Sequence, residues 1–218
     1  MSLSAPTYVP VESWRHVLPS YAWSDWNPYE AVGHPDALRE DELRRLSGRA
    51  ILAYTIACAE WVVYRLTGFL DDARPEWFLE AAWAFEMSER FAAPVESVEA
   101  EWKGPVRGAV DLALMTVLNA IYSLRDGAVE VDAAFAEQLA QHVVPEMEPF
   151  LAWRGRVLPR LANQYPANHE ARYRYVPREA TDPDYNICDE DHAEALVMAF
   201  LRNLDTATNP MLEPVSEA

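Results

Sequence analysis

The chain has 218 residues, half of them hydrophobic, with eight tryptophans and only seven glycines. This composition excludes disordered, collagen-like and low-complexity proteins, and it suffices to bury a hydrophobic core. The 18 basic and 35 acidic residues give a net charge of −17, whose field repels phosphate backbones, so we expect no binding to nucleic acid.

The first 35 residues are predicted to form an extended, aromatic-rich arm that packs on the rest of the protein. The segment contains five prolines, which prevent long helices, so at most a short helix near residues 11–18 is expected. Trp14, Trp23 and Trp26 are candidates for an aromatic box that binds a cation or a partner's side chain, with Trp23 and Trp26 as its binding residues. Alternatively, the arm closes one end of the protein with these rings.

Apolar residues recur at steps of three and four from Asp36 onward, which is the period of an α-helix. Asp36 as an N-cap and Gly68 as a stop signal predict one helix of about 28 to 30 residues. Further helices are predicted over 75–93, 104–126, 132–144, 150–161 and 189–204. The sequence therefore predicts an all-α fold, an irregular bundle of about six helices, with residues 36–205 as a single helical domain.

The segment 166–190 is predicted to be an irregular crossing before the last helix, because three prolines interrupt it. One short extended segment is expected at 172–175, and residues 206–218 are expected to be a loose acidic tail. Residues 148–178 carry a net charge of +4 and residues 179–218 carry −9. The two blocks are expected to pair with each other; an arginine–tyrosine strip that binds anions or RNA is the alternative.

The usual signatures of nucleotide, zinc, di-iron and nucleophile chemistry do not occur in the sequence. No cofactor is therefore expected. The N-terminus lacks the pattern of a signal peptide, and the apolar runs 50–64 and 112–124 are shorter than the roughly 20 residues of a membrane span. We expect no membrane contact, and two cysteines in a chain of this size suit a cytoplasmic protein.

Glu60 is the first candidate for catalysis, because it is a lone carboxylate within the apolar run 50–64. A partly buried carboxylate can serve as an acid, a base or a ligand. The alternative is a structural role, in which Glu60 pairs with an arginine or a tyrosine hydroxyl.

A polar row on two consecutive helices is the second candidate. Asp111 and Asn119 share one side of the first helix, and Gln138 and His142 share one side of the second. In an antiparallel hairpin His142 comes within one turn of Asp111, and such a pair supports acid–base catalysis. Arg107 completes the candidate binding set; hydrogen bonding between the helices without catalysis is the alternative.

Cys188 and His192 are the third candidate, since together with His169 they would supply part of a metal site. The acidic residues around Cys188 and His192 are also stabilising at the N-terminus of a helix, which explains them without a metal ion, so we assign no metal site.

Two functions remain open. The first is a protein-binding module of the inhibitor, immunity or adaptor kind, whose negative field suits a basic partner protein. The second is an enzyme or small-ligand binder with a carboxylate and histidine pocket between helices, and whether any catalysis occurs stays undecided. A homo-oligomer that buries the tryptophan arm against a second copy is a further alternative.

Overall fold

A computed structural model describes residues 3–95, 103–167 and 174–215. These residues form nine α-helices and no strand, which confirms the predicted all-α fold. The described residues form three more helices than predicted, because the predicted helix 36–68 is divided into two helices and the arm contains two short ones. They are α1 (Val11–Trp14), α2 (Pro28–Val32), α3 (Ala37–Leu43), α4 (Gly48–Leu66), α5 (Arg74–Glu86), α6 (Ala109–Asp126), α7 (Val129–Val143), α8 (Met147–Gln164) and α9 (Glu190–Arg202), with short turns η1 (Thr67–Phe69), η2 (Gly104–Gly108) and η4 (Arg178–Thr181).

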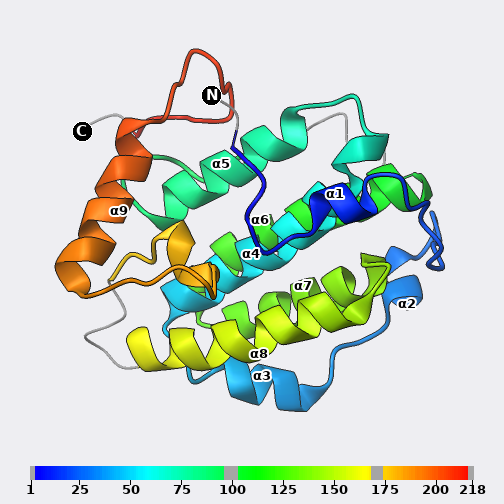
Figure 1. The fold of residues 1–218 in the computed structure, drawn as a ribbon, viewed down its shortest axis with the longest axis horizontal. Helices are drawn as coiled ribbons and strands as arrows, with labels where there is room; N and C mark the ends of the chain where they lie inside the picture. Colours follow the sequence, from blue (N-terminus) through cyan, green and yellow to red (C-terminus); the bar gives the residue numbers. More distant parts are fainter. Residues whose placement is uncertain (1–2, 96–102, 168–173, 216–218) are drawn as a thin grey trace.

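Helix α4 is the centre of the fold. Every residue from Ala50 to Leu66 is buried, and α5, α6 and α7 pack around this helix (Figure 1). The stretch Gly48–Phe69 is long and apolar enough to cross a membrane, although the sequence predicted no segment of that kind. However, 94% of the 18-residue window that meets this criterion is buried inside the protein, as in the core helix of a globular fold.

The predicted long helix from Asp36 to Gly68 is wrong, because the chain turns between α3 and α4. Ser47 caps α4 by accepting a hydrogen bond from the Ala50 N–H at 3.2 Å. Its own N–H donates to the Tyr165 carbonyl at 2.8 Å, and the Ala167 N–H donates to the Arg45 carbonyl at 2.9 Å. Residues 45–47 therefore pair with the chain after α8, which a continuous helix would prevent.

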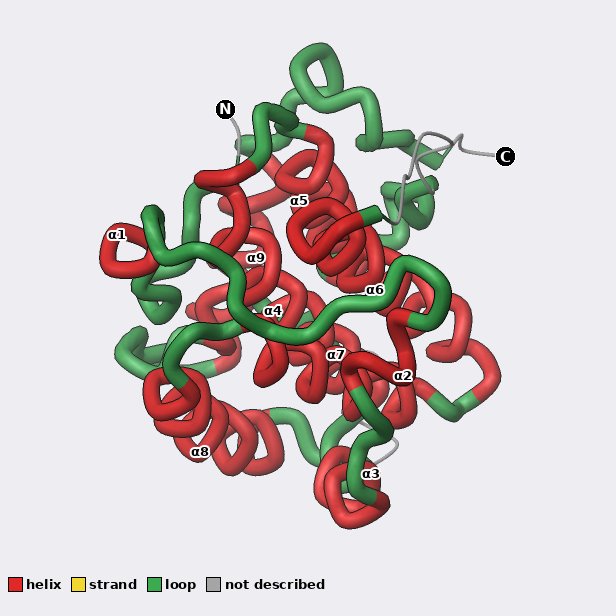
Figure 2. The backbone as a smooth tube through the Cα atoms, turned by 90° about the vertical axis from the view of Figure 1, so that its right-hand side faces the viewer, coloured by secondary structure: helices red, strands yellow, loops and turns green. Residues whose placement is uncertain are grey.

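The N-terminal arm lies along the bundle and contributes to its core. Leu3, Val9 and Trp14 are buried, and the Tyr64 hydroxyl on α4 donates to the Leu3 carbonyl at 2.8 Å. Buried Arg65 donates to the Trp14 carbonyl at 3.2 Å, at the end of α1. The chain between α1 and α2 then crosses one end of the bundle (Figure 2).

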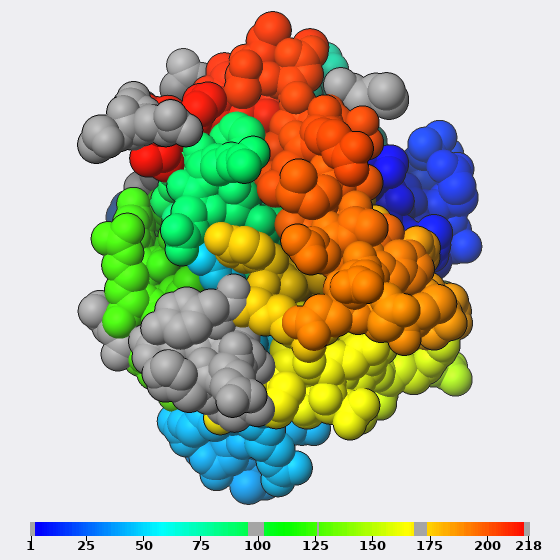
Figure 3. Space-filling model, turned by 90° about the vertical axis from the view of Figure 1, so that its left-hand side faces the viewer, coloured from blue at the N-terminus to red at the C-terminus, as the bar shows by residue number. Residues whose placement is uncertain are grey.

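The segment after α9 was expected to be loose, but as far as Val215 it is held against α5 and the chain that follows α5 (Figure 3). Buried Asn209 donates through Nδ2 to the Trp77 carbonyl at 2.9 Å and to Glu80 at 2.8 Å. Phe91 and Pro214 form an isolated antiparallel bridge. Asn209 and Leu212 are the buried residues that anchor this segment.

The irregular crossing before α9 carries ion pairs between the basic and acidic blocks. Arg156 contacts Asp184 at 2.5 Å and Arg174 contacts Glu190 at 3.3 Å. Arg160 donates to the Asp182 carbonyl at 2.6 Å. Part of the extended segment expected at 172–175 lies outside the described residues; from residue 174 the chain leads without regular structure into η4.

Candidate functional site

Glu60 lies at the centre of the protein and binds three donors. Its Oε1 accepts from Arg178 Nε at 2.7 Å and from Trp83 Nε1 at 3.0 Å, and its Oε2 accepts from the Tyr8 hydroxyl at 2.5 Å. The Tyr8 ring stacks on Trp153 with the ring centroids 5.3 Å apart. Glu60 is fully buried, and both of its oxygens accept hydrogen bonds, which link α4 to the arm, α5 and η4. This geometry agrees with the structural role considered for Glu60, in which the carboxylate pairs with an arginine or a tyrosine hydroxyl.

A second buried carboxylate, Glu137 on α7, was not among the candidate residues predicted from the sequence. It accepts from the Tyr54 hydroxyl at 2.9 Å, Arg154 Nε at 2.8 Å and Gln141 Nε2 at 3.0 Å. Arg39 Nη1 lies 3.5 Å away. The signal was present, because Glu137 follows Ala133 by four residues and precedes Ala140 by three, so it lies on the buried face of α7.

Asp111 and Arg107 form an ion pair at the start of α6. Arg107, in the π-helical turn η2, contacts Asp111 at 2.8 Å and also contacts Asp72. Burial raises the pKa of Asp72, but hydrogen bonds from Arg74 and Arg107 outweigh this effect and lower the pKa to about 2. Asp111 therefore belongs to a charge cluster that joins the beginnings of α5 and α6.

The other members of the predicted polar row fix the arm to α7. His142 Nε2 lies 2.7 Å from the Ala22 carbonyl, and its ring meets Tyr21 edge-on at 5.2 Å. Gln138 donates to the Val32 carbonyl at 3.3 Å and accepts from Arg39 at 2.7 Å. Asn119 is exposed. The structure thus places Glu60, Asp111 and His142 in three separate sets of partners.

The three tryptophans of the arm lie in different environments. Trp14 is buried against Trp61, with the ring centroids 5.8 Å apart. Trp23 is half-buried and donates to Asp25 at 3.0 Å, whereas Trp26 is 98% exposed. Each of the other tryptophans that the structure describes is buried or half-buried.

Trp26 lies on a turn that hydrogen bonds hold in place. The Asn27 N–H donates to Ser24 Oγ at 3.1 Å, and Asn27 Oδ1 accepts from the Glu30 N–H at 3.2 Å as the N-cap of α2. Asp25 accepts from the Gly104 N–H at 2.7 Å, which ties the turn to η2. The exposed ring is therefore carried by an ordered backbone.

Cys188 and His192 contact each other at the start of α9. The Cys188 N–H lies 3.3 Å from His192 Nδ1, and Asp189 caps the helix by accepting from the His192 N–H at 2.8 Å. Among the described residues, no three histidine, cysteine, aspartate or glutamate side chains gather into a group that would hold a metal ion. His169, the expected third member, lies outside these residues.

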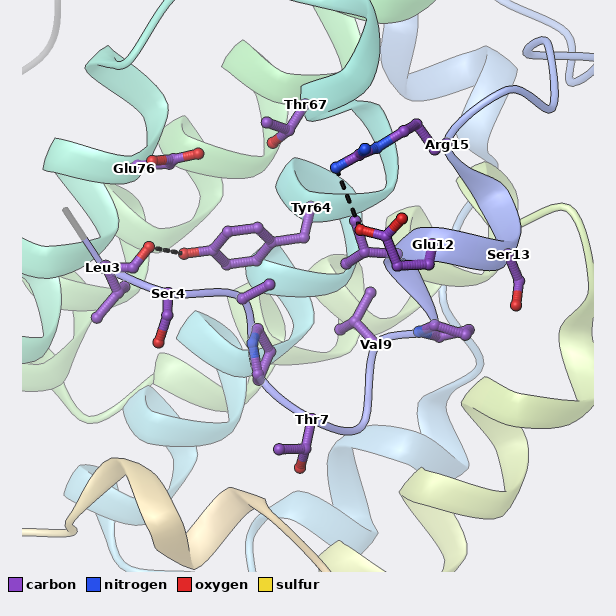
Figure 4. A pocket seen from close by; sticks show the side chains of 14 residues that line it. Leu3, Ser4, Thr7, Val9, Glu12, Ser13, Arg15, Tyr64, Thr67 and Glu76 are labelled. Atoms are coloured by element: carbon purple, nitrogen blue, oxygen red, sulfur yellow. Dashed lines mark hydrogen bonds and ion pairs between the residues drawn. The ribbon is translucent and has the colours of Figure 1, made fainter.

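A groove of about 560 Å³ runs between the arm and the junction of α4 and α5 (Figure 4). Its apolar lining includes buried Leu3, Val9 and Tyr64. Its polar part consists of Ser4, Thr7, Glu12, Ser13, Arg15, Thr67 and Glu76. Nothing in the sequence predicted this groove, because one wall is the arm, which has no periodic pattern.

Comparisons with protein-family models, with curated proteins and with solved structures find no match.

Proposed function

We propose that this chain is an acidic, cytoplasmic helical module of the inhibitor, immunity or adaptor kind, which binds a basic partner protein with Trp26 as its anchor. The observation that carries the proposal is the 98% exposure of Trp26 on a hydrogen-bonded turn. A large aromatic ring buries about 150–250 Å² in an interface, equivalent to about 4–6 kcal/mol of transfer free energy. An ordered turn loses little conformational entropy on binding, so more of this free energy is retained.

The surroundings of Trp26 favour a protein interface. Leu18, Tyr29 and Leu38, which lie within about a dozen residues of Trp26 in the sequence, are 73%, 46% and 73% exposed. Several exposed apolar side chains in one segment favour an interface over a single exposed ring.

The charge of this part of the chain favours a basic partner over a second copy. Residues 17–42 contain six acidic side chains and one basic side chain, Arg39. Three of the acids, Glu40, Asp41 and Glu42, pair with Arg44 and Arg154, which leaves Asp25, Glu30 and Asp36 as the acidic side chains nearest to Trp26 in sequence. Two such surfaces face to face would place like charges together, whereas a cationic partner would be attracted to this surface. The alternative of a pocket with carboxylates and a histidine has less support, because Glu60, Asp111 and His142 each contact different partners.

The experiment compares three immobilised proteins in an extract of the source cells at low ionic strength. They are the wild type, Trp26→Ala, and Met198→Ala as the control, since Met198 is an exposed apolar residue on α9 (40%). We expect the wild type and the control to retain the same basic protein, and Trp26→Ala and a high-salt wash to lose it. With the purified partner, Trp26→Ala should weaken binding by about 30-fold or more. Equal retention by all three proteins, or no basic protein retained, would refute the proposal.

A further inference from the structure

Arg65, in the last turn of α4, is a buried cation without a counter-ion. The residue is 2% exposed, and no carboxylate in the described part of the chain forms an ion pair with it. Burial lowers the pKa of its guanidinium, and Tyr21 acts in the opposite direction. By contrast, Arg178 and Arg154, which also reach into the core, each pair with a buried glutamate.

The donors of Arg65 are directed at the backbone of the arm. Its Nη1 donates to the Trp14 carbonyl at 3.2 Å, and its Nη2 donates to the Val17 carbonyl. α1 ends at Trp14, and carbonyls at the end of a helix lack a partner within the helix and favour a nearby positive charge. Because a helix of four residues is not stable by itself, Arg65 fixes the backbone of the arm where α1 ends.

The chain that follows is fixed at further points along one end of the bundle, which residues 15–27 cross (Figure 2). The Tyr21 hydroxyl donates to a carbonyl of η2, and the Ala22 carbonyl lies 2.7 Å from His142 Nε2. Asp25 accepts from an N–H of η2 at 2.7 Å. Together with the contact at the end of α1, these bonds order the backbone of the whole segment before any partner binds.

Two large apolar side chains of this ordered segment are exposed to solvent. Leu18, which directly follows the second carbonyl held by Arg65, is 73% exposed, and Trp26 is 98% exposed. Pro19 restricts the backbone of Leu18 to extended conformations. Eight residues span at most about 28 Å, and an interface patch of about 800 Å² is roughly 30 Å across. One partner can therefore contact both side chains.

Stability does not explain why this buried position is occupied by arginine. A buried charge without a counter-ion disfavours folding, and an apolar residue of similar volume is often as stable or more stable there. Residues that disfavour folding are typical of positions on which function depends. At Arg65 the structural consequence is the fixed backbone immediately before Leu18.

We propose that Arg65 is a positioning residue, which holds Leu18 in place as a second apolar contact for the basic partner that binds at Trp26. The proposal rests on the proposed function, because it concerns the same partner and the same end of the bundle. A side chain on a backbone that is ordered before binding loses less conformational entropy in the complex, so more of the free energy of burying it is retained as affinity.

The first experiment is a double-mutant cycle in the binding of the purified partner to the full chain. Leu18→Ala should weaken binding by about fivefold, whereas Met198→Ala, an exposed apolar control on α9, should leave it unchanged. Arg65→Met should weaken binding by a similar factor in the wild type and in Trp26→Ala, but by less than about 1.5-fold in Leu18→Ala. Wild-type affinity of Leu18→Ala, or a full effect of Arg65→Met in Leu18→Ala, would overturn the proposal.

The second experiment needs no partner and measures amide hydrogen exchange at Val17, whose N–H donates to the Trp14 carbonyl at 3.0 Å. Arg65→Met should accelerate this exchange by about tenfold and leave the amides of α6 and α7 unchanged. Arg202→Met is the matched control, because exposed Arg202 also donates to a carbonyl near the end of its helix, at 3.1 Å. It should leave Val17 unchanged. An unchanged rate in Arg65→Met would contradict the positioning role.

A conservative variant covers the case in which Arg65→Met does not fold. Arg65→Lys keeps the positive charge but cannot donate to both carbonyls in the fork geometry of a guanidinium. It should therefore accelerate exchange at Val17 by a smaller factor, and weaken partner binding less, than the loss of the whole contact. Exchange and binding equal to those of the wild type would show that the charge alone suffices, against the proposed positioning.

Failure of this proposal is distinguishable from failure of the proposed function. If the wild type retains no basic partner, the proposed function is wrong, and the second contact is wrong with it. If Trp26→Ala loses the partner but Leu18→Ala binds it like the wild type, the proposed function stands and only the contact at Leu18 is wrong.

Discussion

Glu86 provides the sharpest test of the interior electrostatics. This carboxyl group at the end of α5 is fully buried; its Oε1 accepts from the Val176 N–H at 3.1 Å, and its Oε2 has no hydrogen-bond partner among the residues that the structure describes. Burial raises its pKa from 4.5 to about 8, although Arg49 and the Val176 N–H act in the opposite direction. The folded protein therefore keeps Glu86 protonated at neutral pH, whereas the unfolded chain releases the proton.

The pKa difference fixes the direction and size of the pH effect. Between pH 4.5 and 8 the folded state binds one more proton than the unfolded state, so the free energy of unfolding falls as pH rises. Each pH unit lowers it by about 1.4 kcal/mol, and the whole interval by roughly 5 kcal/mol. Below pH 4.5 both states are protonated and above pH 8 both are ionised, so the effect levels off on either side.

Glu86→Gln removes this titration, since glutamine has the shape of the protonated acid and its Oε1 can still accept from Val176. We expect the variant to exceed the wild type in unfolding free energy by roughly 3 kcal/mol at pH 7, with a difference that grows from pH 5.5 to 8 and is constant above. Urea unfolding followed by tryptophan fluorescence measures the difference at pH values above the isoelectric point of about 4.6. Glu89→Gln, an exposed control three residues further along the chain, keeps Glu86, so its unfolding free energy should differ from that of the wild type by an amount that does not change between pH 5.5 and 8. A difference that stays constant from pH 5.5 to 8 would refute the assignment of a protonated Glu86.

Two further substitutions test how the core is connected. Ser47→Ala removes the cap of α4 and should lower the free energy of unfolding by about 1 kcal/mol, whereas Ser13→Ala, on the exposed wall of the groove, should change it little. Arg178→Met leaves Glu60 buried without its cation and should cost about 3–5 kcal/mol, measured by urea unfolding. A loss below 1 kcal/mol for Arg178→Met would show that the Tyr8 and Trp83 donors alone stabilise Glu60.

The helical period predicted the fold class but not the break between α3 and α4. Leu43, Leu46 and Ala50 keep the spacing of three and four residues across the turn, so the local pattern continues where the helix ends. The turn is formed because residues 45–47 hydrogen-bond to residues 165 and 167. A contact between segments about 120 residues apart cannot be predicted from the spacing of apolar residues within either segment.

The buried carboxylates show which parts of the interior a sequence can reveal. Glu60, Glu86 and Glu137 all lie on apolar helix faces, so their burial follows from spacing: Glu86, for example, continues the buried positions Leu79, Ala82 and Trp83 of α5. Their partners do not follow, because Tyr8 and Arg178 lie 52 residues before and 118 residues after Glu60. Only the fold decides whether such a group is a catalyst or an ion-pair partner.

The exposure of the tryptophans in the arm could not be predicted from the sequence either. Trp14 and Trp26 lie in similar surroundings of prolines, polar residues and other rings, yet Trp14 is 2% exposed and Trp26 is 98% exposed. Trp14 lies at the end of α1, where Arg65 donates a hydrogen bond to its carbonyl and its ring packs against Trp61. Trp26 lies on a turn in which hydrogen bonds fix the backbone and the ring is exposed to solvent. Since the same fold buries Tyr54, Trp61, Trp83 and Tyr165, a shortage of buried sites does not explain the exposure of Trp26, and the proposed partner would cover this ring.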